Sequence, residues 1–445
     1  MFHNLENYNI LFYGKDIIVV AKLFDLKECV VTFTSRGDED ALPHVPFGGN
    51  MLSGRHISHI CVISMSNHWW STEEWIPCLD AVKNFISLNN LKKTVLYGVS
   101  MGGYGALLAS NCLVPDRVVV FGAQFSISPK VIPEDSRWLS DWNNLFSTKD
   151  MKLPEVPFSS EVIYLYDPNT IDKLHAHQYK EAIKQICFIR FPFAGHEVFN
   201  TLKELKLAGE IALYALSFEH SIDSIREFCC VSYRKNRRDS QSYWKNILSY
   251  KKENRLKASA VSFLLKEPDL NFVSKLSLAN ELNSSGQSAD NTKSIYFSAI
   301  IDLPTHSAPW RGLWAIYAKE EKYLLSLKSA LIALANREND EDLLRVVVLA
   351  ADAAGDRKLV ELVASILLEK DIDGVHTLNV LNKAKFDVSD RISVSSEAYQ
   401  DFRRLLAYFK EQALNLSLLN DTSIDKIKIP QLENINHSIN TFIER

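Results

Sequence analysis

The chain has 445 residues, of which 47% are apolar and 23% charged, so its composition is that of an ordinary globular protein with room for two or three domains. Its net charge of -4 is near neutral for this length and gives no reason to expect nucleic acid or an anionic membrane as a partner. The first residues lack the pattern of a signal peptide and no window is apolar enough to span a membrane, so we expect a cytoplasmic protein.

Residues 1–217 alternate short β-branched runs with helical patterns, the order expected of a parallel sheet covered by helices. Eight runs predict strands: NILFYG, DIIVVAKLF, CVVTFTS, HICVISM, TVLYGV, RVVVFGA, EVIYLY and ICFIRF. Helices are predicted at residues 72–90, 102–113, 173–185 and 197–217. A capping-box pattern at Ser71 or Thr72 marks the start of the first helix. The seven cysteines form no C-x-x-C pair, and Cys61 and Cys187 lie within strands, so we expect reduced, buried thiols, no metal site and no cofactor.

The pattern changes at residue 218. Residues 218–260 form a basic, helix-compatible connector, and residues 261–445 carry leucine and alanine at helical spacing with almost no strand signal. Turns are predicted at Gly286, near Lys319, at Gly355 and near Asp390. Their interval of about 34 residues is the length of a helix-turn-helix repeat, in which each hairpin buries its apolar face on its neighbours.

One segment of this half carries a more specific pattern. Residues 310–317, WRGLWAIY, keep the tryptophan, leucine and tyrosine of W-x-x-L-G-x-x-Y, with Trp314 in place of the glycine. Small residues follow at Ser326 and Ala333. Residues 261–445 therefore resemble a degenerate tetratricopeptide array. The resemblance implies a binding surface for a protein, a glycan or a second copy of this chain.

Residues 97–106, YGVSMGGYGA, place Ser100 between glycines, after an apolar strand and before a helix. Residues 98–102 match the pattern G-x-S-x-G at every fixed position. Such a sharp turn strains the serine backbone and leaves no room for side chains at the glycine positions. It lifts the hydroxyl clear of the sheet, in front of a helix N-terminus that favours developing negative charge. The chain here resembles an α/β-hydrolase, and the resemblance covers most of residues 1–217.

The resemblance implies a catalytic triad in which Ser100 is the nucleophile. His196 is the base that we expect, because it follows the last strand in FPFAGHE, on a short loop ahead of a helix. The alternative is that His196 only caps that helix. His175 and His177 are separated by one residue on a predicted helix, and we expect both to face solvent.

Two aspartates are candidates for the triad acid. Asp167 stands at the end of the preceding strand, and Asp172 lies five residues further on. We expect Asp167 to be the acid, because its distance from the following helix suits the role and because Asp172 can be the N-cap of that helix. The reverse assignment stays open, since acids of this family often lie several residues beyond the strand. The acid orients the imidazole and stabilises its protonated form.

The resemblance also implies an oxyanion hole made from the backbone N–H of Met101 and a second N–H from the loop after the third strand. That loop reads TSRG where many esterases have His-Gly-Gly. We expect Ser35 to be the second donor, with Arg36 as the alternative. Arg36 is also a candidate for binding an anionic substrate, or for a surface ion pair with Asp38 or Glu39.

Two further segments are candidates for substrate binding. Trp69 and Trp70 follow the fourth strand, at the same edge of the sheet as Ser100, where they can stack on a sugar or acyl chain or pack beneath a loop. Residues 128–158 form a long insertion, rich in aromatic residues and proline, at the usual place of a lid. We expect this insertion to shape the substrate pocket.

These features predict an α/β fold of the α/β-hydrolase type followed by an all-α repeat domain, and a serine hydrolase that cleaves an ester through an acyl-enzyme. The segments VVTFTSRG and ISHICVISMSNHWW are also similar to hydrolase-like proteins found with bacterial surface-polysaccharide machinery, which implies an acyl ester on a carbohydrate. Acyl transfer by the same triad is the first alternative and peptidase activity the second. The third is a non-catalytic scaffold that binds through its repeats. We expect residues 1–217 to hold the complete catalytic apparatus.

Overall fold

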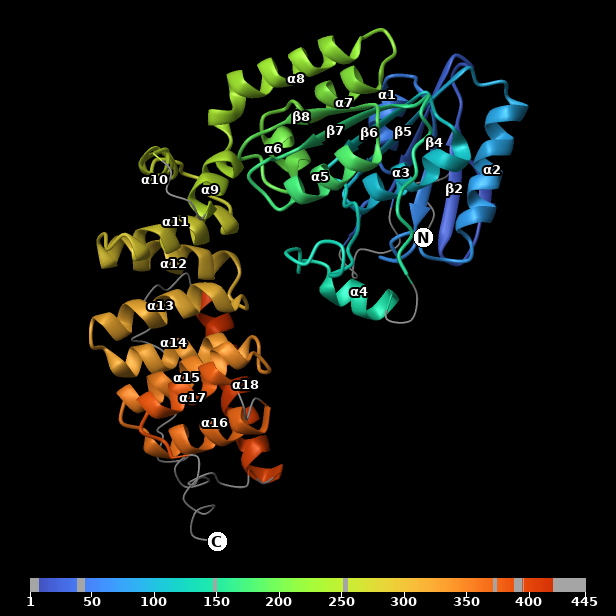
Figure 1. The fold of residues 1–445 in the computed structure, drawn as a ribbon. Helices are drawn as coiled ribbons and strands as arrows, with labels where there is room; N and C mark the ends of the chain where they lie inside the picture. Colours follow the sequence, from blue (N-terminus) through green and yellow to red (C-terminus); the bar gives the residue numbers. More distant parts are fainter. Residues whose placement is uncertain are drawn as a thin grey trace. The chain divides into compact units, whose positions relative to one another are not determined.

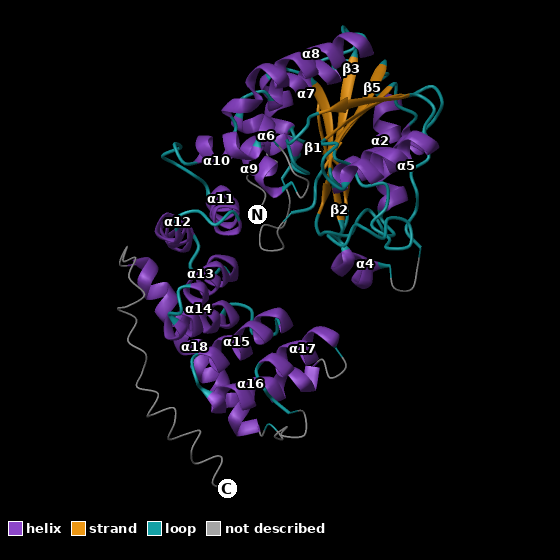
Figure 2. Cartoon of the chain, turned by 60° about the vertical axis from the view of Figure 1, so that its left-hand side comes forward, coloured by secondary structure: helices purple, strands orange, loops and turns teal. Residues whose placement is uncertain are grey.

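The computed structural model describes residues 8–37, 45–146, 150–250, 255–370, 374–387, 394 and 396–418. The chain forms two compact units, Met1–Asn254 and Arg255–Arg445. The described strands all lie in the first unit, and the described part of the second consists of helices and their connections (Figure 1, Figure 2).

An eight-stranded sheet organises the first unit, with the strand order β1-β2-β4-β3-β5-β6-β7-β8. Strand β2 is antiparallel to both of its neighbours, and the other strand pairs are parallel. The strands are β1 (Asn9–Tyr13), β2 (Ile17–Lys22), β3 (Glu28–Phe33), β4 (Ser58–Ser64), β5 (Lys93–Val99), β6 (Arg117–Phe121), β7 (Glu161–Tyr166) and β8 (Ile186–Arg190). This strand order, with helices on both faces, is the α/β-hydrolase fold and confirms the predicted fold class.

All eight predicted strands are present, because their apolar runs suit a sheet that is covered on both faces. In β4 and β6 every residue is buried. The helices of this unit are α1 (Gly49–Gly54), α2 (Trp75–Leu88), α3 (Met101–Leu113), α4 (Leu139–Leu145), α5 (Asp172–Ala182), α6 (Val198–Glu204), α7 (Ala208–Leu216), α8 (Ile222–Asn236) and α9 (Gln241–Ser249), with the short 3-10 helix η2 (Arg237–Asp239) between the last two. The predicted helix at 197–217 is two helices, because Lys206 interrupts it with a φ of 58°.

The predicted capping box at the start of α2 is wrong. The helix begins at Trp75, and its N-cap residue Glu74 makes no capping hydrogen bond. The Glu74 carboxylate instead accepts N–H groups from the β1–β2 turn, including that of Asp16 at 2.9 Å. Thr72 donates to the Asp16 carboxylate at 2.6 Å. These side chains therefore tie the helix to the first hairpin rather than cap it.

The second unit contains α10 (Lys257–Leu264), α11 (Phe272–Ser284), α12 (Ala289–Asp302), α13 (Ser307–Lys319), α14 (Tyr323–Ala335), α15 (Glu341–Ala353), α16 (Arg357–Lys370), α17 (Val375–Lys383) and α18 (Ser396–Leu418). Helices α11 and α12, α13 and α14, and α15 and α16 pack in consecutive pairs, and α18 packs against α14 and α12. The turns within the three pairs contain Gly286, Glu321 and Gly355, each with a positive φ. The predicted turn near Asp390 lies outside the described residues. In the described part of the chain, no helix is long and apolar enough to cross a membrane.

Candidate active site

Ser100 lies at the turn between β5 and α3, with a φ of 52° and a ψ of -122°. This is a strained conformation for a residue other than glycine. A Cβ at Gly98 would collide with the carbonyl of Gly102, and a Cβ at Gly102 would collide with the carbonyl of Phe33 on the neighbouring strand. The glycines of the motif are therefore required by backbone packing, as the sequence pattern indicates.

His196 lies between Ser100 and an aspartate. Its Nε2 is 3.4 Å from Ser100 Oγ, and its Nδ1 is 2.7 Å from Oδ2 of Asp172. Because a carboxylate only accepts hydrogen bonds, Nδ1 carries the hydrogen and Nε2 is an acceptor. The amide nitrogen of Gln124 also lies 3.4 Å from this Nε2. The His196 side chain is 20% exposed, whereas that of Asp172 is fully buried. The histidine can therefore reach a ligand, while its partner is shielded from water.

The expected contact between Asp167 and His196 is not formed. Asp167 accepts the backbone N–H of Gly195 at 2.7 Å and that of Asn169 at 2.8 Å. Burial raises its pKa to about 6, against these hydrogen bonds, which lower it. Asp172 is the first residue of α5 rather than its N-cap, so the structural role that the sequence offered for it is absent. The turn at 167–171 brings the Asp172 carboxylate to His196. The Asp167 carboxylate instead binds the loop that precedes His196.

The insertion at 128–158 reaches the buried acid through an arginine. Arg137 donates to Oδ1 of Asp172 at 2.9 Å and forms a two-pronged ion pair with Asp135. Burial raises the pKa of Asp172, but His196 and Arg137 lower it by more, so it lies below the ordinary value. The carboxylate therefore stays ionised between two groups that use its two oxygens.

The solvent-facing position predicted for His175 is wrong, because this side chain is fully buried. Its Nδ1 accepts the N–H of Phe125 at 3.0 Å, so its Nε2 carries the hydrogen and donates to Asp135 at 2.9 Å. The pKa of Asp135 is raised by burial but lowered further by Arg137 and His175. A chain of polar contacts thus joins His175 through Asp135 and Arg137 to the acid beside His196.

Trp138 and Gln124 are site residues that the sequence reasoning missed. The Trp138 ring stands edge-on to the His196 ring, with centroids 5.9 Å apart. Gln124 is fully buried, and its Oε1 accepts a hydrogen bond from Ser100 at 3.3 Å. Its Nε2 donates to the carbonyl of Gly122 at 3.2 Å. Neither residue belongs to a recognisable motif, so only the fold reveals them.

Met101 and Ser35, the candidate oxyanion donors, both lie beside the turn of Ser100. Met101 is the first residue of α3, so its N–H has no acceptor within the helix. In the parallel ladder Phe33 is paired with Gly98, so Ser35 leaves β3 beside the turn that carries Ser100. Within the described residues, neither N–H is taken by another backbone acceptor. Trp70 donates to the Met101 carbonyl at 2.9 Å and anchors this first turn.

Arg36 pairs with Asp141 of α4 at 2.8 Å and 3.1 Å, and its guanidinium lies 5.5 Å from the Trp138 ring centre. The expected alternatives Asp38 and Glu39 lie outside the described residues. Arg36 therefore ties the loop after β3 to the insertion instead of presenting a free cation to an anionic substrate.

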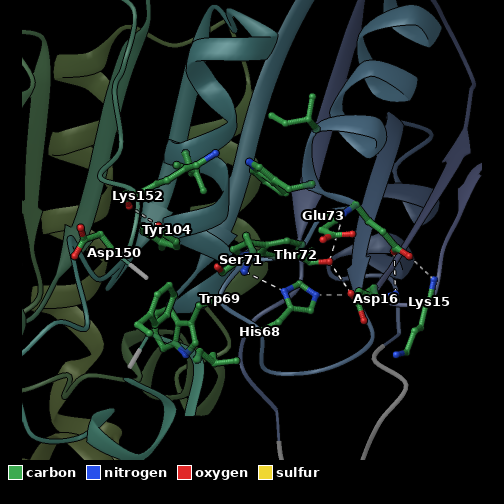
Figure 3. A pocket seen from close by; sticks show the side chains of 17 residues that line it. Lys15, Asp16, His68, Trp69, Ser71, Thr72, Glu73, Tyr104, Asp150 and Lys152 are labelled. Atoms are coloured by element: carbon green, nitrogen blue, oxygen red, sulfur yellow. Dashed lines mark hydrogen bonds between the residues drawn. The ribbon is translucent and has the colours of Figure 1, made fainter. Parts of the chain in front are cut away.

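Trp69 and Trp70 are not on an exposed rim. Their exposed fractions are 0% and 2%, and Trp69 donates to Asp141 at 2.7 Å. Both line a cavity of about 750 Å³ whose lining does not include Ser100 or His196. Figure 3 shows this cavity, with His68 beside Asp16 in its wall. Of the two alternatives for these indoles, packing beneath a loop is the one that the structure shows, since they lie behind the serine turn and under the insertion.

The loop that carries His196 is held from beyond residue 217. Tyr233 of α8 donates to the carbonyl of Pro192 at 2.8 Å, and Asn246 of α9 donates to that of Phe193 at 3.1 Å. Gly195 has a φ of 84°, and a Cβ there would press on the Asn246 amide. Residues in the predicted connector thus complete the support of the histidine. No group of three side chains suited to bind a metal occurs in the described ranges.

No family model and no curated protein matches the chain. Among solved structures, it is similar to the capsule O-acetyltransferase of Neisseria meningitidis serogroup A, with 14% identity, 45% of this chain and 93% of that chain covered, and a TM-score of 0.33. It is also similar to MGS-M1, an α/β hydrolase from a deep-sea metagenome library, with 13% identity, coverage of 53% and 98%, and a TM-score of 0.34. A third is the glycosylation-associated Gap123 complex of Streptococcus agalactiae, with 14% identity, coverage of 47% and 44%, and a TM-score of 0.32.

Proposed function

We propose that the protein is a serine hydrolase that cleaves a carboxylic ester, with Ser100, His196 and Asp172 as its triad. One observation carries the proposal: the two nitrogens of a single imidazole face a strained serine hydroxyl and a buried, ionised carboxylate. A serine, a base and an acid in this order form the machinery of covalent acyl chemistry. The sequence similarity to polysaccharide-associated proteins supports an acyl ester on a carbohydrate as the substrate class.

In the first step, Ser100 Oγ attacks the acyl carbon while its proton moves to His196 Nε2. The carbonyl oxygen becomes an oxyanion, which the N–H groups of Met101 and Ser35 stabilise. When the intermediate collapses, the ester C–O bond breaks and His196 returns the proton to the leaving alcohol. A water molecule then repeats the cycle on the acyl-enzyme, releasing the acid and restoring Ser100. Asp172 keeps its negative charge and stabilises the imidazolium in both steps.

A fluorophosphonate probe with intact-mass readout tests this proposal. We expect a single adduct on Ser100 in the wild type and none in Ser100→Ala. The alanine variant should also lose about 10⁴- to 10⁶-fold in turnover of p-nitrophenyl acetate. Ser249→Ala is the matched control, because that exposed hydroxyl donates only to the Lys245 carbonyl in its own helix. An unlabelled wild type, or full activity in Ser100→Ala, would overturn the assignment.

A further inference from the structure

The loop after β3 carries Ser35, and the sheet fixes the residue before it. Thr34 donates its backbone N–H to the carbonyl of Val62 at 3.2 Å, and its hydroxyl accepts the N–H of Ser64 at 2.8 Å. These two bonds extend the pairing of β3 with β4 by one residue. The backbone on the other side of Ser35 has left the sheet, so other contacts must hold it.

Side chains hold the loop beyond Ser35. Arg36 donates to both oxygens of Asp141 in α4, from Nε at 2.8 Å and from Nη2 at 3.1 Å. Gly37 exchanges two hydrogen bonds with the Asn67 amide, at 3.1 Å and 2.8 Å. Charge-assisted, two-pronged contacts are stronger than neutral ones, so the Arg36–Asp141 pair is the stronger of the two supports.

The carboxylate of Asp141 is itself fixed. Trp69, which is fully buried, donates its indole N–H to Oδ2 of Asp141 at 2.7 Å. The Trp138 ring lies 5.6 Å from the Trp69 ring and 5.5 Å from the Arg36 guanidinium. The arginine is therefore held between a ring and a carboxylate that both belong to the insertion. A displacement of α4 would pull on the backbone next to Ser35.

We propose that Asp141 is a positioning residue for the oxyanion hole, and that it acts through Arg36 on the backbone N–H of Ser35. The inference rests on the proposed esterase function, and it gives Arg36 a role other than binding an anionic substrate. An oxyanion donor acts on charge that develops in the transition state. Because a misplaced donor costs rate rather than ground-state binding, loss of this support should lower kcat and leave KM nearly unchanged.

The first test is Asp141→Asn on p-nitrophenyl acetate. Asparagine keeps one oxygen for the Trp69 N–H but removes the charge and one of the two acceptors of the Arg36 guanidinium. We expect kcat to fall about tenfold with little change in KM. Asp342→Asn is the matched control, because this 66% exposed carboxylate pairs with Arg345 at 2.8 Å in the second unit. An unchanged kcat in Asp141→Asn, or a loss confined to KM, would overturn the proposal.

The second test measures the oxyanion hole directly, with phenyl trifluoromethyl ketone as an inhibitor. Ser100 Oγ adds to its carbonyl carbon, the serine proton moves to His196, and the carbonyl oxygen becomes an oxyanion without any group leaving. The inhibition constant in Asp141→Asn should rise by the same factor as kcat/KM falls, about tenfold. A lower kcat with unchanged inhibition would show that Asp141 does not act on the oxyanion hole.

The third test asks whether Asp141 acts through Arg36. Arg36→Met should be about as slow as Asp141→Asn, and the double variant should be no slower than either, because all three break the same contact. Losses that multiply in the double variant would overturn the proposed route. Arg36→Met also tests the contact if Asp141→Asn does not fold, since the arginine side chain is 31% exposed. Rates are expressed per mole of Ser100 labelled by the fluorophosphonate probe, so that a smaller folded fraction is not counted as a slower enzyme.

Failure of this inference is distinct from failure of the proposed function. If the wild type hydrolyses p-nitrophenyl acetate through Ser100 but Asp141→Asn and Arg36→Met match it, only the positioning role is wrong. If the wild type neither hydrolyses the acetate nor reacts with the fluorophosphonate probe, the esterase proposal itself is wrong.

Discussion

The serine half of the site is built from neighbours in sequence, and the histidine half from distant segments. The turn of Ser100 depends on Gly98 and Gly102, which lie two residues away on either side. His196 depends on Asp172, and the support of that pair comes from Arg137 in the insertion and from Asn246 in α9. A short motif can therefore specify the proposed nucleophile. The position of the proposed base is a property of the whole first unit.

Substitutions far from Ser100 in the sequence should affect the two halves of the site differently. Backbone collisions fix the serine turn, and they do not depend on flexible side chains. The histidine loop is held by side-chain hydrogen bonds from Asp167, Tyr233 and Asn246, any of which one substitution removes. Changes far from Ser100 in sequence should thus alter rate mainly through the histidine half.

The largest expected effect separates the two aspartates. Asp172→Asn should reduce kcat by about 10⁴-fold, because an amide favours the wrong tautomer of His196. Asp167→Asn should cost less than about tenfold, since Asp167 bonds backbone N–H groups rather than the imidazole. Steady-state kinetics on p-nitrophenyl acetate measure both. A slow Asp167→Asn beside a near-normal Asp172→Asn would reverse the assignment.

The second prediction concerns the pH dependence of stability at Asp167. Its pKa is raised to about 6 in the fold, from 3.8, because burial disfavours the charged form. The native state therefore binds this proton more tightly, so the stability it contributes is fully present below about pH 3.8 and is lost as pH rises through 6. The difference corresponds to about 3 kcal/mol.

Denaturant unfolding of the wild type and Asp167→Asn between pH 3.5 and 7 measures this effect. The free energy of unfolding of the wild type, relative to the variant, should fall by up to about 3 kcal/mol across that range. Asp223→Asn is the control, because that side chain is 90% exposed. A difference that stays constant with pH would show that burial does not raise the pKa of Asp167.

The third prediction tests whether the insertion contributes to the triad. Arg137→Met should lower kcat by about 10²-fold, because Asp172 loses the partner that fixes its second oxygen. Arg137→Lys should recover part of the loss by restoring the charge. Arg404→Met, a substitution of an 80% exposed arginine in α18, is the matched control. Equal kcat in Arg137→Met and the wild type would leave the insertion without a part in positioning the acid.

The smallest expected effect comes from α9. Asn246→Ala should lower kcat by about tenfold with little change in KM, because the loop before His196 loses one support and gains freedom. Asn236→Ala is the control, since Asn236 donates only to Ser232 in its own helix. If the two variants behave alike, the contact between Asn246 and the histidine loop does not matter for catalysis.

The two units differ in a related way. The first buries many polar side chains that bond across the sequence, among them Gln124, Asp135, Asp167, Asp172 and His175. The large core cluster of the second is formed by apolar residues of α11 to α18. Burying a polar side chain costs free energy, so the buried polar side chains of the first unit are candidates for a catalytic role. An apolar helical core is explained by packing alone. This contrast is why the proposed chemistry lies in the first unit.

The sequence by itself determined the features that short-range geometry dictates. Apolar runs predicted all eight strands, and the glycines around Ser100 predicted its turn. The position of His196 after the last strand, on a short loop, predicted that it lies near Ser100. The helical pairs at Gly286 and Gly355 followed from turn residues and spacing. In each case a few contiguous residues contain the physical reason.

Only the tertiary structure decided which side chains meet. The sequence does not decide whether Asp167 or Asp172 contacts His196, but the turn between β7 and α5 brings only Asp172 to the histidine. The burial of Trp69 depends on Asp141 in an insertion far along the chain, and no local pattern encodes that contact. A side chain a few ångströms out of place makes no hydrogen bond, and its position is set by the summed packing of the elements around it.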